Sequence, residues 1–193
     1  SAPIAKGHPT MSTHYTATAK LIHWLMATLL FGLLALGFYM TDLPFSPQKL
    51  QLYSWHKWAG VTVFLLLIFR LLWRLKNPPP PLPESMPKAT QWVAHAGHFA
   101  LYALMAAIPL SGWLMSSAKG FQTVYFGVLP IPDLIEKNKE LGQLLGEVHE
   151  TLAWLFVLLI VGHTAAALKH HFIDKDDILI RMSPDHRKHS GEQ

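Results

Sequence analysis

Residues 21–40 contain no charged side chain, and this run limits what the chain can fold into. A single helix of about twenty apolar residues crosses the hydrocarbon core of a bilayer, which is ~30 Å thick. Comparable runs follow at about residues 52–75, 91–117 and 148–168, and the second relies on its flanking Lys and Arg side chains reaching the membrane surface. Because lipid offers the backbone no hydrogen-bond partners, the pattern predicts an all-α membrane protein, a bundle of four transmembrane helices.

The remaining segments are predicted to be connections and tails. Residues 15–182 form a single four-helix domain in this prediction, preceded by residues 1–14, a processed tail or cloning scar, and followed by residues 183–193, a basic tail. The proline-rich residues 77–87 predict a stiff turn between the second and third spans. In residues 118–147 several leucines recur near helical spacing, which predicts an interfacial amphipathic helix leading into the fourth span.

The basic residues are distributed unevenly about these spans. Eleven of the sixteen Lys and Arg residues lie in the N-terminal tail, the second connection and the C-terminal tail, whereas five lie on the opposite side. Since basic residues concentrate in cytoplasmic loops, both termini are predicted to face the cytoplasm. The location of these residues at the ends of apolar runs favours contact with phospholipid headgroups over binding of nucleic acid.

Two histidines, His149 and His163, lie near the two ends of the fourth span. Their spacing of fourteen residues is about 3.9 helical turns, so both rings project from nearly the same face, roughly 21 Å apart. The chain has twelve histidines and no cysteine, which excludes disulfides, iron–sulfur clusters and covalently attached haem. Any metal chemistry is therefore expected to use histidine.

Histidines of the other spans lie at the same two depths. With the predicted topology, His56 of the second span is near the outer face, as His149 is, and His23 of the first span is near the inner face, as His163 is. Two facing pairs of imidazoles inside a four-helix bundle are what two bis-histidine b-type haems require. With both axial positions filled, iron has no vacant site for O₂, so such centres carry electrons.

Other residues near these pairs have both a functional and an ordinary interpretation. Arg70 returns to the face of His56 at the inner depth, where it either pairs with a haem propionate or anchors the chain to lipid. His95 and His98 begin the third span, where the roles of propionate donor, proton relay, alternative ligand or no special task all stay open. Packing on a porphyrin is one interpretation, and ordinary bundle core or an interfacial aromatic belt is the other, for four aromatic residues: Trp24, Phe31, Trp58 and Trp154.

His170 lies seven residues past His163, about two turns further along the same face and at the inner boundary. An imidazole at this level can hydrogen-bond a quinone carbonyl and deliver a proton to it, a task that suits histidine near neutral pH. The neighbouring His171 is predicted to point about 100° away. The alternative is a charged tail that contacts lipid headgroups.

Five short motifs occur in a defined order along the chain. They are HW at His23, WHKWAG around His56, AHAGH in residues 94–98, the spacing of His149 and His163, and ALKHHFIDKDD in residues 167–177. Over about residues 15–182 the chain resembles the bacterial cytochrome b561 family, relatives of the di-haem cytochrome b subunits of nickel-iron hydrogenase and formate dehydrogenase.

The resemblance implies two haems b in the bacterial inner membrane, held by His23 with His163 and by His56 with His149, and electron exchange with quinone near the inner haem. In a close relative the activity is oxidation of periplasmic superoxide with reduction of ubiquinone. It therefore implies an oxidoreductase with ubiquinone as exchangeable substrate; the alternative is a non-catalytic electron-transfer subunit that docks a periplasmic redox partner. Charges on the outer connection act on an anionic donor in both directions: Asp133, Glu136, Glu140 and Glu147 repel it, and Lys119, Lys137 and Lys139 partly offset them.

Overall fold

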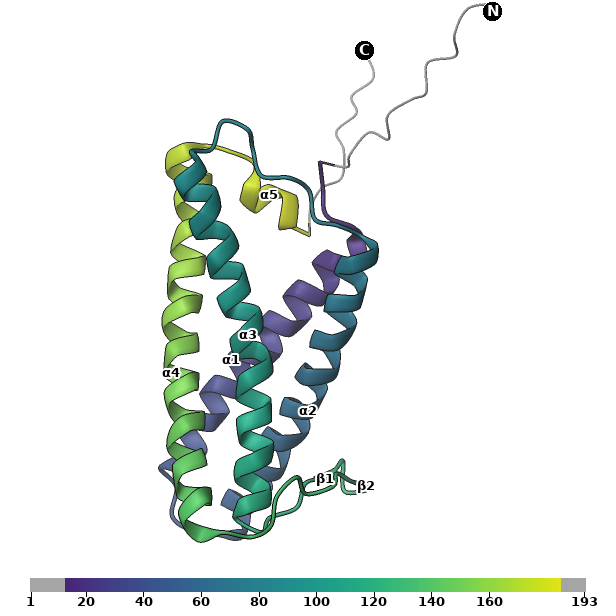
Figure 1. The fold of residues 1–193 in the computed structure, drawn as a ribbon, viewed down its shortest axis with the longest axis vertical. Helices are drawn as coiled ribbons and strands as arrows, with labels where there is room; N and C mark the ends of the chain where they lie inside the picture. The colour runs from purple at the N-terminus through teal and green to yellow at the C-terminus, as the bar shows by residue number, and fades with distance from the viewer. Residues whose placement is uncertain (1–12, 185–193) are drawn as a thin grey trace, which may run out of the picture.

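The computed structural model describes residues 13–184 and consists mainly of four long helices (Figure 1). They run alternately in opposite directions and are α1 (Ala17–Thr41), α2 (Pro47–Lys76), α3 (Lys88–Ala118) and α4 (Lys139–Lys169). Each is long and apolar enough to cross a membrane, which confirms the predicted fold class. We call the end where α1 begins and α4 ends the inner end, since the basic residues predict that it faces the cytoplasm, and the opposite end the outer end.

Side chains cap the first turns of α1, α2 and α4, which begin before their apolar runs. Thr16, Ser46 and Asn138 each accept a hydrogen bond from the backbone N–H three residues later, at 3.1, 3.2 and 2.9 Å. Such a cap satisfies a donor that has no partner within the helix. Pro47 occupies the first position of α2, where the missing N–H would have been unpaired anyway.

The predicted amphipathic helix leading into the fourth span is present in residues 139–147, but as the first turns of α4, and the rest of the outer connection has a different structure. Residues 119–138 contain instead an antiparallel hairpin of β1 (Val124–Tyr125) and β2 (Leu129–Pro130). The three-residue loop 126–128 between the paired strands holds Phe126 and Gly127 at φ 50° and 70°, and tight hairpin loops commonly use such positive values. The leucines with helical spacing lie mostly after the Asn138 cap, so they belong to the first turns of α4.

Two segments form the inner connections. Residues 77–87 pass from α2 to α3 without regular helix, as their prolines predict. After α4 the chain makes one π-helical turn, η1 (His170–Asp174), and then changes direction at Lys175, which has φ 54°. The α-helical geometry therefore ends just before His170, the residue predicted to contact quinone.

The short helix α5 (Ile178–Met182) folds back over the inner end of the bundle (Figure 1). Arg181 Nη1 donates to the Pro81 carbonyl at 2.8 Å, and Trp24 Nε1 donates to the Met182 carbonyl at 2.9 Å. These two bonds tie the end of the described chain to the α2–α3 connection and to α1.

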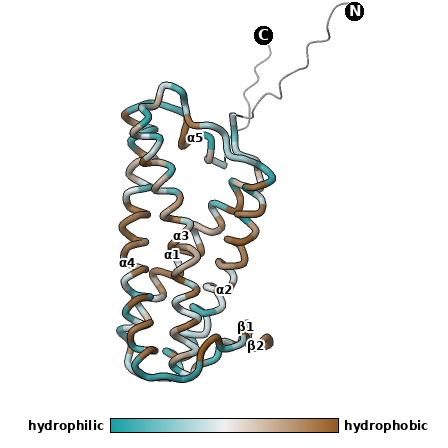
Figure 2. The backbone as a smooth tube through the Cα atoms, in the orientation of Figure 1, coloured by the Kyte–Doolittle hydropathy of each residue, from teal (hydrophilic) through white to brown (hydrophobic). Residues whose placement is uncertain are grey.

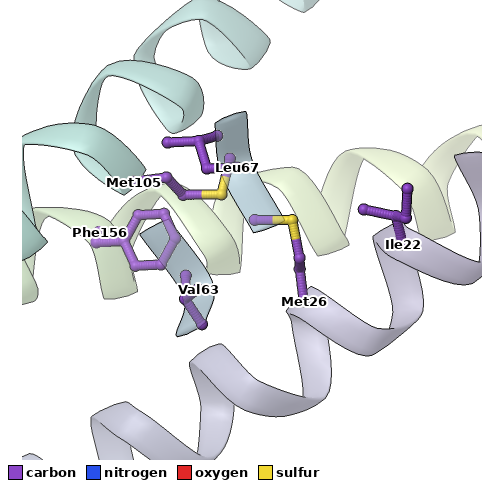
Figure 3. Close-up of a cluster of buried hydrophobic side chains, with 6 residues drawn as sticks. All are labelled: Ile22, Met26, Val63, Leu67, Met105 and Phe156. Atoms are coloured by element: carbon purple, nitrogen blue, oxygen red, sulfur yellow. The ribbon is translucent and has the colours of Figure 1, made fainter. Parts of the chain in front are cut away.

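The bundle is made of two helical hairpins. Backbone contacts are far more extensive within the α1–α2 pair and within the α3–α4 pair than between the two pairs. A small apolar core joins the four helices (Figure 3); its buried members are Ile22, Met26, Val63, Leu67, Met105 and Phe156. Figure 2 shows hydrophobic residues along the helices and hydrophilic residues gathered mainly at the two ends, as lipid around the bundle would require.

Candidate functional site

Site residues recur at a fixed interval along three helices, on either side of the apolar core. On each of these helices a core residue lies midway between two site residues. One site residue is seven positions away toward the outer end, and the other is seven positions away toward the inner end. The triplets are His56–Val63–Arg70, Gly112–Met105–His98 and His149–Phe156–His163. Because seven residues are about two turns, each triplet shares a helix face, and the outer and inner layers are roughly 21 Å apart.

The outer layer brings together His56 of α2 and His149 of α4, as predicted. Their ring centres are 6.3 Å apart and the ring planes make an angle of 79°. His149 Nδ1 lies 3.0 Å from the Ile108 carbonyl oxygen and 2.9 Å from Ser111 Oγ. A carbonyl can only accept, so Nδ1 carries the proton and Nε2 keeps its lone pair. This is the tautomer of a histidine that binds a metal through Nε2.

Two glycines lie against the rings of the outer pair. A Cβ atom at Gly37 of α1 would lie 3.2 Å from His56 Cε1, and one at Gly112 of α3 would lie 3.1 Å from His149 Cε1. Both distances are shorter than ordinary van der Waals contact, so α1 and α3 reach these rings because a side chain is absent there. The prediction missed both glycines, although each lies fourteen residues from an inner-layer histidine of its own helix.

The inner layer contains three histidines rather than the predicted pair alone. His23 of α1 and His163 of α4 have ring centres 6.4 Å apart and ring planes at 49°. His98 of α3 also contacts His163, with centres 5.6 Å apart and an edge-to-face angle of 70°. His95, by contrast, is exposed. Of the two histidines whose role the sequence left open, only His98 therefore belongs to the site.

Arg70 lies in the inner layer, at the depth its spacing predicts. Its Nη2 is 3.2 Å from His23 Nδ1, and its Nε donates to the Tyr102 hydroxyl at 3.0 Å. Arginine has no acceptor, so His23 Nδ1 accepts this hydrogen bond and the neutral ring has its proton on Nε2. Tyr102 was not predicted, but it lies one turn after His98 on α3.

The distances between the paired rings fit a metal cofactor held by two imidazoles. Imidazole nitrogens bind a transition metal at about 2 Å and the ring centre lies about 1 Å behind the nitrogen, so two rings on opposite sides of one ion have centres about 6 Å apart. The measured 6.3 and 6.4 Å agree with this value. Direct contact of aromatic rings covers the same range. Two further observations are therefore needed to support a cofactor. His149 has the tautomer of a metal ligand, and His56 Nδ1 is buried without a hydrogen-bond partner in residues 13–184.

The four aromatic residues singled out in the sequence occupy different environments. Trp24 packs edge-to-face on His23, with ring centres 5.2 Å apart. Trp154 packs on Phe38 at 4.6 Å, Trp58 contacts the β1–β2 hairpin, and Phe31 is exposed. Of these four, the structure places Trp24 against a candidate ligand, and it places the others in packing or on the surface.

At the inner end, His170 is held by two carboxylates. Its Nδ1 lies 2.7 Å from Asp176 Oδ2 and 3.2 Å from Asp174 Oδ2. Carboxylates accept hydrogen bonds, so Nδ1 donates and Nε2 faces away from this pair. The π-helical turn and the left-handed Lys175 bring the two carboxylates onto one ring, which a continuing α-helix, as predicted, would not do.

Known proteins resemble this chain over most of its length. Residues 14–185 match the family model described as prokaryotic cytochrome b561. The chain is 41% identical over 176 residues to cytochrome b561 homolog 2 of Escherichia coli K12, covering 87% of this chain and 90% of the relative. It is 30% identical over 182 residues to the probable superoxide oxidase CybB of Yersinia pestis, covering 92% and 99%. Cytochrome b561 homolog 1 of Escherichia coli K12 is 31% identical over 177 residues, covering 88% and 97%.

Proposed function

The chain belongs to the prokaryotic cytochrome b561 family, and on this premise we propose that it carries electrons through two b haems from superoxide at the outer face of the bacterial inner membrane to ubiquinone at the inner face. His56 with His149 holds the outer haem, and His23 with His163 holds the inner haem. The observation that carries this proposal is the spacing of the two ring pairs, 6.3 and 6.4 Å, at two depths of one bundle. Both termini face the cytoplasm in this arrangement.

The haems supply one-electron transfer, and the residues of the chain decide where it takes place. Each haem would be held by one pair of imidazoles, His56 with His149 or His23 with His163, which would leave its iron no open position for O₂. The Ile108 carbonyl and the Ser111 hydroxyl hold His149 in the tautomer that a ligand needs. Arg70 is the cation beside the inner pair. It would pair with a haem propionate, and His23 would then be free to adopt the tautomer that His149 has.

Superoxide is supported as donor by the relative from Yersinia pestis, which is named a probable superoxide oxidase. A second support is Lys119, whose Nζ is 3.4 Å from the position of a Cβ on Gly146, one turn outward of His149 on α4. This ammonium group lies outward of His149, near the outer pair, where its charge attracts an anion. In the reaction two superoxide anions each lose one electron to become O₂, and one ubiquinone takes up those two electrons and two protons.

At the inner end, His170 is the hydrogen-bond and proton partner of ubiquinone. Because His170 Nδ1 donates to Asp176, its Nε2 carries a proton only when the ring is an imidazolium. The imidazolium donates to the quinone carbonyl, and the carboxylates of Asp174 and Asp176 are its counter-charges. His170 therefore binds the quinone and delivers a proton to it from the inner side.

One observation favours a second candidate function, a non-catalytic electron-transfer subunit that docks a periplasmic redox protein. The β1–β2 hairpin at the outer end carries exposed apolar side chains, among them Val128, which is 83% exposed. An exposed apolar patch marks a surface that binds either protein or lipid.

The test of the proposed function is to mix the purified protein with ubiquinone and a source of superoxide, then follow quinone reduction. Superoxide dismutase should abolish the reduction, and a pyridine haemochrome assay should give two haems per chain. The His95→Ala variant is the matched control, since this exposed histidine lies outside the site. Reduction that needs a periplasmic extract instead of superoxide would support the second function, and one haem per fully loaded chain would refute the two-haem proposal.

A further inference from the structure

Residues 121–132, which we call the outer hairpin segment, contain no charged side chain. The large apolar side chains at its tip are exposed, with Phe126 at 60% and Val128 at 83%. Figure 2 colours β2 as strongly hydrophobic, although it belongs to a connection and not to a membrane-spanning helix. In water this segment would be an apolar patch without a partner.

The outer hairpin segment is attached to α2 at two positions of the charge-free centre of that helix. Trp58 Nε1 donates to the Val124 carbonyl at 2.7 Å, and the hydroxyls of Thr62 and Tyr125 are 2.7 Å apart. Trp58 and Thr62 belong to residues 58–69, the charge-free centre of α2. Because helical side chains lean toward the N-terminus, which is the outer end of α2, the hairpin lies outward of these positions, beside the outer half of α2 (Figure 1).

Backbone carbonyl groups of the segment accept hydrogen bonds from side chains, most of them on the membrane-spanning helices. The pairs are Phe121 O with Lys57 Nζ at 2.9 Å and with Ser116 Oγ, Val124 O with Trp58 Nε1 at 2.7 Å, Ile131 O with Gln122 Nε2 at 3.1 Å, and Pro132 O with Trp113 Nε1 at 2.8 Å. Pro130 and Pro132 have no N–H to satisfy. A backbone that enters lipid needs such partners, because the bilayer supplies none.

We propose that the outer hairpin segment is an interfacial membrane anchor, seated in the outer leaflet with Phe126 and Val128 among the acyl chains. Three features identify lipid as the occupant: the absence of charge, the attachment to the charge-free centre of α2, and the side-chain partners of the carbonyl groups. An apolar face of this size enters the boundary between headgroups and acyl chains by about 5 to 10 Å. With the segment in lipid, a periplasmic redox protein would have to dock on other parts of the outer face.

The absence of cysteine allows a clean test with single spin labels. The full chain with its haems bound carries Val128→Cys, is spin-labelled and is reconstituted into phosphatidylcholine vesicles. Power-saturation spectra then measure collisions with O₂, which concentrates in hydrocarbon, and with a water-soluble nickel chelate. Glu136→Cys, an exposed charged position of the same connection, is the aqueous control, and Leu65→Cys, an exposed position at the centre of α2, is the lipid control.

The expected ratio of O₂ to nickel collisions at position 128 is close to that at position 65 and well above that at position 136. A ratio equal to that at position 136 would place the hairpin in water and overturn the proposal. Few collisions with either reagent would mean that protein covers the hairpin, which also overturns it. Phe126→Cys, at the turn, repeats the measurement at a second site. None of these readouts depends on electron transfer, so the result stands apart from the proposed redox function.

Discussion

The outer and inner layers contain the same kind of histidine pair but differ in how firmly the rings are held. In the outer layer His149 donates to Ile108 and Ser111, and glycines of two helices press on both rings. In the inner layer His163 has two histidine neighbours, His23 and His98, and the Arg70 guanidinium donates a hydrogen bond to Nδ1 of His23. The outer pair is thus already arranged as two ligands, whereas the inner pair would have to rearrange to bind the proposed haem.

The largest expected effect is the loss of one haem when one axial ligand is removed. His149→Ala should remove the outer haem and leave the inner one, and His163→Ala should do the reverse, because each ring belongs to one layer. The measurement is the reduced-minus-oxidised spectrum together with haem content, in variants whose folding is checked by circular dichroism. Loss of the same haem in both variants would break the division into two layers.

A second pair of variants decides which neighbour of His163 is its partner in ligation. His23→Ala should remove the inner haem, whereas His98→Ala should retain it, because the 6.4 Å between the His23 and His163 ring centres matches the 6.3 Å of the outer pair, whereas His98 lies only 5.6 Å from His163. Haem content and the low-temperature spectrum of the inner haem report the result. Retention of the inner haem in His23→Ala and loss in His98→Ala would reverse the assignment.

His170→Ala should weaken quinone reduction while both haem spectra stay intact. Removal of a buried polar partner typically costs on the order of 1 to 3 kcal/mol, which corresponds to a rate roughly 5- to 150-fold lower. The steady-state rate with ubiquinone measures the effect, and reduction of the outer haem should be unchanged. His171→Ala is the matched control; an effect at His171 without one at His170 would move the quinone site to the other face of the π-helical turn.

A smaller effect is expected from filling the space beside His149. Gly112→Ala adds a Cβ at 3.1 Å from His149 Cε1, and crowding of this size costs about 1 kcal/mol, so affinity for the outer haem should fall roughly fivefold. Gly97→Ala on the same helix is the control, because a Cβ there meets nothing within 4 Å. Haem titration of the two variants compares them. Equal affinities would show that the outer layer is no more tightly packed than the inner one.

The smallest expected effect is on the stability of α5, a helix that covers the inner end of the bundle and has no counterpart at the outer end of the described chain. Arg181 Nε lies 3.0 Å from Asp177 Oδ1 and holds the pKa of this carboxyl below its ordinary value of 3.8. Because the carboxyl has a lower pKa when α5 is folded, the ion pair stabilises α5 at pH values above the ordinary pKa. This stabilisation is lost as the pH falls through the lowered pKa of the folded state. Asp177 is half exposed, so the contribution is a few tenths of a kcal/mol.

Hydrogen exchange of the α5 amides, corrected for the intrinsic pH dependence, should therefore become faster as the pH falls below 3.8. Asp177→Asn should show the faster exchange already at neutral pH and no further change on acidification. If the substituted and original chains exchange alike at neutral pH, the ion pair does not hold α5 in place.

The sequence predicted the features that depend on regular helix geometry. Apolar runs and 3.6-residue periodicity placed four helices and brought His56 to His149 and His23 to His163. It did not predict contacts that depend on the lateral packing of helices, such as His98 with His163 or Arg70 with Tyr102. Spacing along one helix gives depth and face, but not which neighbouring helix lies opposite.

Local backbone geometry was the other source of error. The leucine spacing correctly predicted a helix leading into the fourth span, but the start of that helix at the Asn138 cap and the hairpin turn at Phe126 and Gly127 were not predicted. The α-helix assumed through His170 becomes a π-helical turn, since Asp174 and Asp176 both bind that ring. In both places a few side-chain hydrogen bonds outweigh helical periodicity.

The division of the bundle into two helical hairpins bears on how the protein is assembled in a cell. Each proposed haem takes one ligand from the α1–α2 hairpin and the other from α4, while direct backbone contact between the hairpins is sparse. Two hairpins of this kind can enter the membrane one after the other during synthesis, and haem then joins them, since binding free energy adds to the stability of the assembled state. Cells short of haem would hold two loosely associated halves open to proteolysis, so the abundance of this protein would follow haem supply.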